Sequence, residues 1–365
     1  MIKNFFKVAF RNMKKQKFFA IINLFGLTVG ISAVLFIAMY IADELSYDKF
    51  FPDSERIYRI NLHGKIAGQE ILTSRSNSQL PYALETEIPE VEEATRIFQF
   101  DEWVFRKGDL VYSEDNVYAA DSGYFDVFKL NFIEGDKNGA LTGPHKVVLT
   151  ESVARKYFRD EAAVGKNLTL GDDRTEYMVT GVIQDLPHNT QTPIKVLLSM
   201  DSFEWMNPKE GAWLSNSFQG YYVLRDGASA EAVDEKLRPI IEQNVSPILK
   251  EYMGKTLEQM EAEGGIYEYF SIPLTSIHLY SMIDDEPTPV GDIKYVYILG
   301  AIGAFILLIA AINFMNLSTA KYANRAKEVG LRKTMGSTRK PLIAQFLSES
   351  VLYTALSTLM AIAVV

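Results

Sequence analysis

Charged side chains near the C-terminal end of the sequence recur at intervals that suit a binding surface for another protein. Lys321, Arg325, Glu328 and Arg332 are separated by four, three and four residues, so in a helix all four lie on one face. Gly336 ends this helix, because glycine tolerates the backbone geometry that follows a helix C-terminus. The pattern predicts a short helix that presents a charged stripe to a partner.

The residue types that support catalysis or metal binding lack the spacing that such chemistry requires. The four histidines are scattered without an HExxH motif, so each is interpreted as a surface or core residue. They are His63, His145, His188 and His278. Two acidic pairs, Asp172-Asp173 and Asp284-Asp285, lie beside Gly or Pro, which favours solvated turns over catalytic dyads.

Several motif classes are absent from the sequence. There is no GxSxG nucleophile signature and no GxxxxGK[ST] motif, so the chain cannot bind ATP through a P-loop. The sequence contains no cysteine, which excludes disulfides, thiolate metal sites and a cysteine nucleophile. We therefore expect no catalytic residues, metal ligands or bound cofactor in this chain.

Charge is distributed very unevenly along the 365 residues. Residues 1–17 hold six Lys and Arg and no acid, and residues 318–342 hold seven against Glu328 alone. Residues 43–294 hold 24 Lys and Arg against 44 Asp and Glu, a net charge of about -20. The basic segments flank apolar runs, which argues against nucleic-acid binding and for contact with a lipid bilayer. Residues 1–17 are predicted to form an amphipathic cytosolic helix.

Three apolar runs predict transmembrane helices. Residues 18–42 are uncharged over 25 positions, roughly 37 Å of helix against a hydrocarbon core of about 30 Å. Residues 295–317 form the second run, and residues 343–365 form a third that stops without a flanking loop, so we expect it to be truncated and the sequence to be a fragment. The positions of Lys and Arg predict a cytosolic N-terminus, an extracytoplasmic 43–293 and a cytosolic 318–342.

Five small or polar residues within these runs are candidates for helix packing. Gly26 and Gly30 form a GxxxG motif, which permits close approach of another membrane helix. Asn313 and Asn316 can hydrogen-bond to neighbouring helices or mark the membrane interface. Glu349 lies inside the third run, where a carboxylate is costly unless it is paired or reaches water. We interpret it as a structural or coupling residue in preference to a proton carrier.

Residues 43–293 predict an α+β domain, because helices and strands are mixed without strict alternation. We expect a hairpin that turns near Gly64 to Gly68 and a helix ended by Pro89. A long amphipathic helix is expected after residue 228, with an interruption near Pro247. Residues 101–215 are a candidate inserted subdomain.

Three stretches resemble the permease subunits of MacB-like/FtsX-like ABC transporters. "AKEVGLRKTMGSTRKPLIAQFLSES" is similar to the cytosolic segment between the second and third spans of that family. "VVLTESVARKYF...AVGKNLTL...YMVTGVIQDLP" is similar to its extracytoplasmic domain, and "FKVAFRNMKKQKFFAIINLFGLTVGISAVLF" to its first helices. Together they cover nearly the whole chain. The segment after Pro187, "HNTQTPIKVLLSM", departs from the family pattern.

The resemblance implies a MacB-like periplasmic core domain between spans one and two and a separate ATPase subunit that binds ATP and Mg. It also implies mechanotransmission, in which the ATPase moves the spans and the outer domain changes shape to act on an outer-side substrate. A homodimer or pseudo-dimer of permease halves and a periplasmic or outer-membrane partner are further expectations. The expected ATPase-coupling surface comprises Lys321, Arg325, Glu328, Gly330, Arg332, Lys333 and Gly336.

Two other classes of protein fit parts of the pattern. A membrane-bound sensory receptor also has an extracytoplasmic ligand-binding domain between two spans, but it should continue into a soluble signalling helix where this chain has a third apolar run. A membrane-anchored enzyme would need a nucleophile or metal ligands, and the sequence has no motif that supplies them.

Overall fold

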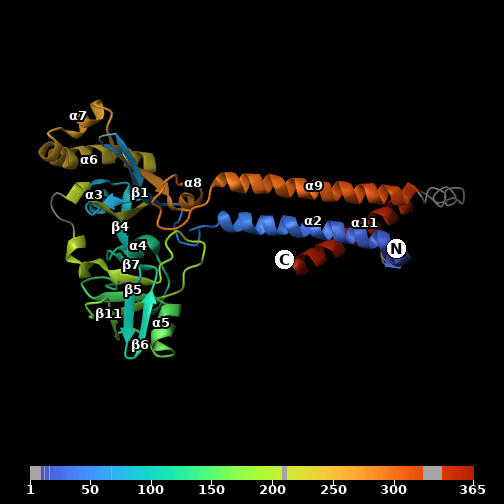
Figure 1. Ribbon diagram of the computed structural model, residues 1–365, viewed down its shortest axis with the longest axis horizontal. Coiled ribbons are helices and arrows are strands. Elements are labelled where there is room, and N and C mark those ends of the chain that lie inside the picture. The colour runs from blue at the N-terminus through green and yellow to red at the C-terminus, as the bar shows by residue number, and fades with distance from the viewer. Residues whose placement is uncertain (1–9, 12, 16, 67, 208–211, 324–338) are drawn as a thin grey trace. The chain divides into compact units, whose positions relative to one another are not determined.

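The computed structural model describes residues 10–11, 13–15, 17–66, 68–207, 212–323 and 339–365. The chain divides into two compact units (Figure 1). One, the helical unit, combines Met1–Leu45 with Asp292–Val365, and the other, the sheet unit, is Ser46–Gly291. Each unit is described by itself.

The described residues of the helical unit form three long helices: α2 (Lys17–Glu44), α9 (Ile293–Ala323) and α11 (Arg339–Val364). Among the described residues, three helical stretches are long and apolar enough to cross a membrane: Lys17–Glu44, Ile293–Thr319 and Leu347–Val364. The first nine residues of the predicted amphipathic helix 1–17 lie outside the described part of the chain.

Small residues let α2 and α9 approach each other closely. A β-carbon added to Gly30 would lie 2.8 Å from Cβ of Ala310, and one added to Gly26 would lie 3.2 Å from Nδ2 of Asn313. Farther along, Gly303 of α9 faces Ile37 of α2. Because residue numbers rise along α2 as they fall along α9, the two helices run antiparallel.

Helix α11 packs on another side of α2 and runs parallel to it. The Ser357 hydroxyl donates to the Leu24 carbonyl over 3.3 Å, and Thr28 lies against the Met360 sulfur. Tyr353 is buried in a small apolar cluster with Ala20. Helix α2 is therefore the central element of the three.

The strands of the sheet unit join in one mixed sheet with the order β14-β1-β13-β4-β7-β12-β9-β11-β10-β5-β6, to which β2, β3 and β8 add as side branches. The strands are β1 (Ile57–Ile66), β2 (Gln69–Thr73), β3 (Ser76–Asn77), β4 (Val91–Gln99), β5 (Trp103–Lys107), β6 (Leu110–Glu114), β7 (Val117–Ala120), β8 (Phe132–Gly135), β9 (Lys146–Thr150), β10 (Asn167–Leu170), β11 (Thr175–Ile183), β12 (Val196–Ser199), β13 (Asn216–Leu224) and β14 (Ile266–Pro273).

Helices cover this sheet and bury its apolar side chains in three clusters. Helices α6 and α7 lie near β1 at one end of the unit, and α5 lies at the other end near β6 (Figure 1). The helices are α3 (Leu80–Glu87), α4 (Tyr124–Phe128), α5 (Glu151–Phe158), α6 (Ala230–Met253), α7 (Leu257–Ala262) and α8 (Ile277–Tyr280), with short 3-10 turns η1 (Met200–Ser202), η2 (Glu204–Met206), η3 (Ala212–Leu214) and η4 (Leu274–Ser276).

Two local predictions are confirmed and two are wrong. The β1–β2 hairpin and the helix α3 before Pro89 are present as expected. Helix α6 runs unbroken through Pro247 and ends at Gly254, whose φ of 72° is left-handed. Burial of one apolar stripe of α6 outweighs the backbone hydrogen bond that a helical proline removes. Residues 101–215 are not a separate unit, because their strands continue the sheet through the β4–β7 pairing.

The close contact at Gly30 predicts that a larger side chain there destabilises the helical unit. Gly30→Val should lower the midpoint of thermal unfolding of the full chain in detergent, because overpacking costs about 1–3 kcal/mol. The matched control is Val29→Leu, since Val29 is 52% exposed on α2. An unchanged midpoint for Gly30→Val would contradict the close packing of α2 and α9.

Candidate functional site

The first residues of the sheet unit are held by a loop from the middle of its sheet. Residues 189–192 belong to the segment that connects β11 to β12. The Asp48 amide donates to the Asn189 carbonyl over 2.9 Å, and the Asn189 side-chain amide donates to the Ser46 hydroxyl over 2.7 Å. The Thr190 hydroxyl donates to the Asp48 carboxylate over 2.6 Å. The loop therefore fixes the segment that follows α2 in the chain.

The same loop also holds the last residues of the sheet unit. The Gln191 side-chain oxygen accepts from the Thr288 hydroxyl over 2.6 Å, and its amide nitrogen lies 2.7 Å from Nδ1 of His278. Because that nitrogen donates, Nδ1 of His278 accepts and the ring proton is assigned to Nε2. The Gly291 amide donates to the His278 carbonyl over 2.8 Å. Gln191 thus contacts two separate points before α9, His278 and Thr288.

An aromatic contact joins the two ends of the unit directly. The Tyr47 and His278 rings are stacked with their centroids 3.4 Å apart and their planes within 1°. Tyr47 belongs to the incoming segment and His278 to α8, near the outgoing end. His278 is buried and Tyr47 is half-buried.

A buried ion pair anchors the outgoing segment to β1. The Arg59 guanidinium donates two hydrogen bonds to the Glu286 carboxylate over 2.7 and 2.5 Å, and both side chains are at most 3% exposed. Arg59 also donates to Asn61, and Ser281 donates to Glu286. Burial alone would lower the pKa of Arg59, but its pairing with Glu286 raises it. We call Asp48, Arg59, Gln191, His278 and Glu286 the junction network.

The Asp48 carboxyl group is a buried member of this network whose pKa is shifted toward neutral pH. Burial raises its pKa to about 6, and the hydrogen bonds from Thr190 and Gln191 and the charge of Arg59 partly oppose that rise. Asp48 is consequently close to the point at which a small environmental change alters its charge.

The predicted membrane-packing residues can all be located in the helical unit. Gly26, Gly30 and Asn313 come together where α2 meets α9, and Asn316 lies one turn farther along α9. Glu349 is 2% exposed on α11. Sequence reasoning missed Asn23, which is buried on α2 and whose side-chain oxygen and nitrogen have no hydrogen-bond partner among the described residues. The signal available in the sequence was the polar side chain of Asn23 within an otherwise apolar, uncharged run.

The predicted coupling surface lies almost wholly outside the described residues. Lys321 belongs to the last turn of α9. The other members fall in 324–338, which the structure does not describe: Arg325, Glu328, Gly330, Arg332, Lys333 and Gly336. Their arrangement stays a prediction.

The histidines and acidic pairs do not form a catalytic or metal centre in the described part of the chain, where no group of three potential metal ligands gathers. His63 pairs with Glu70 on the β1–β2 hairpin. Both acidic pairs lie in exposed turns. The buried carboxylate is the neighbouring Glu286, which sequence reasoning missed because an acid beside two exposed acids resembles solvated surface.

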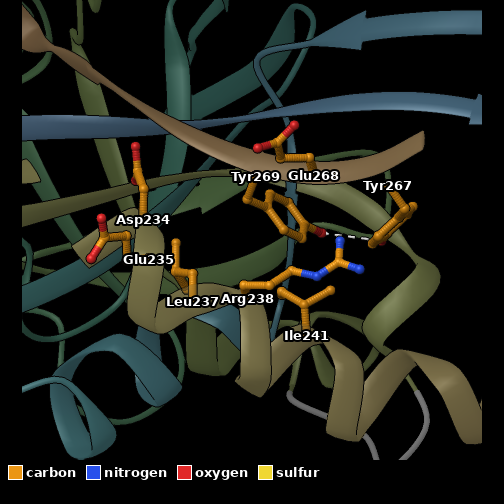
Figure 2. Close-up of a pocket in the computed structure, with 8 residues that line it drawn as sticks. All are labelled: Asp234, Glu235, Leu237, Arg238, Ile241, Tyr267, Glu268 and Tyr269. Atoms are coloured by element: carbon orange, nitrogen blue, oxygen red, sulfur yellow. Dashed lines mark hydrogen bonds between the residues drawn. The ribbon is translucent and has the colours of Figure 1, made fainter. Parts of the chain in front are cut away.

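A cavity of about 240 Å³ lies between α6 and β14 and is rich in carboxylates (Figure 2). Asp234, Glu235 and Glu268 line it together with Arg238. Burial raises the pKa of Asp234, whose carboxylate accepts from the Ser271 hydroxyl. Arg238 is held by Glu261 outside the cavity lining, over 2.6 and 2.5 Å. Two of the four charged groups that line the cavity, Asp234 and Arg238, are therefore bound by neighbouring side chains. The arrangement does not have the geometry of a catalytic site.

Apolar helices that come before and after an α+β domain in the sequence define the chain as a membrane protein with one large domain outside its spans. The MacB-like periplasmic core domain family matches residues 20–240, and the FtsX-like permease C-terminal family matches residues 300–365. The chain belongs to the MacB-like/FtsX-like family of ABC transporter permeases. Membership implies an ABC ATPase partner and a location in the cytoplasmic (inner) membrane.

Similar proteins carry related descriptions. YvrN of Bacillus subtilis, described as an uncharacterized ABC transporter permease, is 23% identical over 98% of this chain and 84% of its own length. A macrolide export ATP-binding/permease protein, MacB of Wolinella succinogenes, is 23% identical over 98% of this chain and 52% of its own length. The chain therefore spans about half of that longer relative.

A solved structure supports the fold of the sheet unit. It is a domain of a candidate permease protein from Porphyromonas gingivalis, with a TM-score of 0.51 and 26% identity. The match covers 61% of this chain and 91% of that domain. The expected α+β extracytoplasmic domain is confirmed.

The raised pKa of Asp48 predicts that the stability of the folded chain depends on pH. Its pKa of about 6 in the folded state exceeds the ordinary value of 3.8, so between these pH values the unfolded chain binds fewer protons. The contribution of protonated Asp48 to stability is therefore complete below about pH 4 and lost as the pH rises through 6. Asp48→Asn should remove this loss, which amounts to at most about 3 kcal/mol.

The measurement is the unfolding midpoint of the full chain in detergent from pH 4 to 8, for wild type and Asp48→Asn. Asparagine keeps the oxygen that accepts from Thr190, so the native hydrogen bond survives. The wild-type midpoint should fall relative to the variant as the pH rises from 4 to 6 and then run parallel to it. A difference that does not depend on pH would refute the assigned titration.

Proposed function

We propose that this chain is a mechanotransmitting permease subunit, in which a separate ATPase moves the membrane helices and the sheet unit changes shape to act on an outer-side substrate. The junction network is the observation that carries the proposal. It binds the first and last segments of the sheet unit to one another and to the sheet. A displacement of either segment must therefore move the other or break buried hydrogen bonds.

The chain path gives this network its mechanical role. Helix α2 ends at Glu44, and the network begins with Ser46 and Asp48. At the other end, Gly291 lies two residues before the start of α9, and its amide donates to the His278 carbonyl. The linking segments are too short to absorb large movements, because an extended residue spans at most about 3.6 Å. Movement of α2 relative to α9 would therefore strain the hydrogen bonds of the junction network directly.

The helical unit supplies the other half of the mechanism. Helix α2 packs closely against α9 through glycine and against α11 through Ser357. Packed helices transmit displacement because their contacts cannot be compressed. A force applied at the cytosolic end of α9 would thus reach α2 as well as the sheet unit.

The ATPase is proposed to dock on the cytosolic segment 318–342, with a cytosolic N-terminus and the sheet unit outside. Seven Lys and Arg in that segment support both the orientation and an electrostatic interface. ATP and Mg would be bound by the ATPase, and two permease halves would form a homodimer or pseudo-dimer. Export or extraction of an outer-side molecule, with or without a periplasmic or outer-membrane partner, is the proposed outcome.

Capture of the ATPase tests this proposal. The complete permease, tagged and purified in detergent from its host, should retain an ABC ATPase, and Glu328→Lys combined with Arg332→Glu should reduce the retained ATPase at least tenfold. The matched control is Lys65→Glu combined with Glu70→Lys on the β1–β2 hairpin, which also exchanges two charges. Equal capture by both variants would refute the docking surface, and no ATPase with wild type would refute the transporter proposal.

A further inference from the structure

Five aromatic side chains form a contiguous patch on the sheet unit, which we call the aromatic platform: Phe98, Phe100, Trp103, Phe203 and Trp205. The Phe100 and Trp103 rings are stacked with centroids 4.8 Å apart, and Phe203 contacts Phe100 at 5.1 Å. Trp205 meets the Phe98 ring edge to face at 5.2 Å and is 53% exposed. The other four rings are only partly buried. Exposed apolar patches of this kind mark interaction sites.

The platform is held in place from beneath. The buried Arg96 guanidinium donates to the Met206 carbonyl over 2.6 Å and pairs with Asp121 over 2.9 Å. The same guanidinium lies 4.8 Å from the centre of the Phe218 ring, which in turn contacts Phe98. These contacts fix the backbone beside Trp205 and the ring under Phe98. A preformed surface loses little conformational entropy when it binds a ligand.

Acidic residues are interspersed with the aromatic residues in the segments that form the platform. The platform is built from segments 98–103 and 201–206, which together contain four acids and no Lys or Arg. Asp101, Glu102, Asp201 and Glu204 are all exposed. Aromatic faces are electron-rich and attract cations, and exposed carboxylates add to that attraction. The charge and the apolar surface together are complementary to a molecule that is both cationic and apolar.

The spacing of the rings suits an extended chain. Neighbouring ring centroids in the platform lie 4.8 to 6.5 Å apart. An extended peptide presents side chains on one face about every 7 Å and the intervening side chains on the opposite face. Its apolar side chains can therefore pack along the row of rings, while its long cationic side chains bend back past the edge of the peptide toward the carboxylates.

We propose that the aromatic platform binds a cationic amphipathic peptide segment on the outer side of the membrane. The assignment of this segment as the substrate class rests on the proposed transport function. Binding itself requires only the sheet unit and needs neither ATP nor the ATPase.

The test uses the full chain in nanodiscs of zwitterionic phosphatidylcholine and an eight-residue synthetic peptide of alternating leucine and lysine as the probe. Calorimetry should detect saturable binding that weakens as salt is added. The analogue with glutamate in place of lysine should not bind. Binding equal to that of protein-free nanodiscs, or equal binding of the glutamate peptide, would overturn the proposal.

Variants locate the binding. Trp205→Ala and, separately, Glu204→Lys should each weaken binding of the lysine peptide at least tenfold. Tyr252→Ala is the matched control, because Tyr252 is 79% exposed on α6 and should be silent. Unchanged affinity in both platform variants would overturn the assignment. Since the measurement omits the ATPase, failure here leaves ATPase capture unaffected, and loss of ATPase capture leaves peptide binding unaffected.

Discussion

The junction network depends on the buried Gln191 amide, because this single side chain hydrogen-bonds to two separate points near the outgoing end of the sheet unit. Its oxygen accepts from Thr288 and its nitrogen contacts His278. The preceding Thr190 holds Asp48. A buried amide that loses one partner costs about 1–3 kcal/mol, so the segments are fixed relative to each other by the penalty of leaving polar groups unsatisfied.

The Arg59–Glu286 pair fixes the position of the outgoing segment more than it adds to net stability. Removing two charges from water costs several kcal/mol per ion, and their attraction roughly offsets that cost when geometry is good. Asn61 and Ser281 satisfy further polar groups of the pair. The benefit is specificity, since few alternative placements of the outgoing segment give both charges a partner. The proposed transmission role requires this property, because slippage at the junction would reduce the movement that reaches the sheet unit.

The sequence predicted what depends on composition and periodicity. Uncharged runs identify membrane helices because a bilayer imposes length and apolarity, and the β1–β2 hairpin and α3 follow local turn and proline signals. The unbroken α6 was not predictable from Pro247 alone, because tertiary burial of its apolar stripe decides the outcome. The continuity of the sheet through residues 101–215 likewise depends on pairing between distant strands.

The junction network was largely beyond sequence reasoning. Gln191 lies in the segment after Pro187 that departs from the family pattern, and polar residues in a loop usually indicate solvent exposure. Only the fold reveals that Gln191, Asp48 and Glu286 are buried and come from three distant segments. By contrast, the GxxxG motif is a local signature of close helix approach, and Gly26 and Gly30 lie where α2 meets α9.

Hydrogen exchange on the full chain in detergent tests the central claim most directly, by comparing wild type with Gln191→Ala and with the exposed control Gln184→Ala. If the network joins both ends of the sheet unit, Gln191→Ala should speed exchange at the Asp48 and Gly291 amides together, by about tenfold for each 1.4 kcal/mol of lost protection. The Gln184 control should leave both amides unchanged. Faster exchange at only one of the two amides, or at neither, would contradict the account.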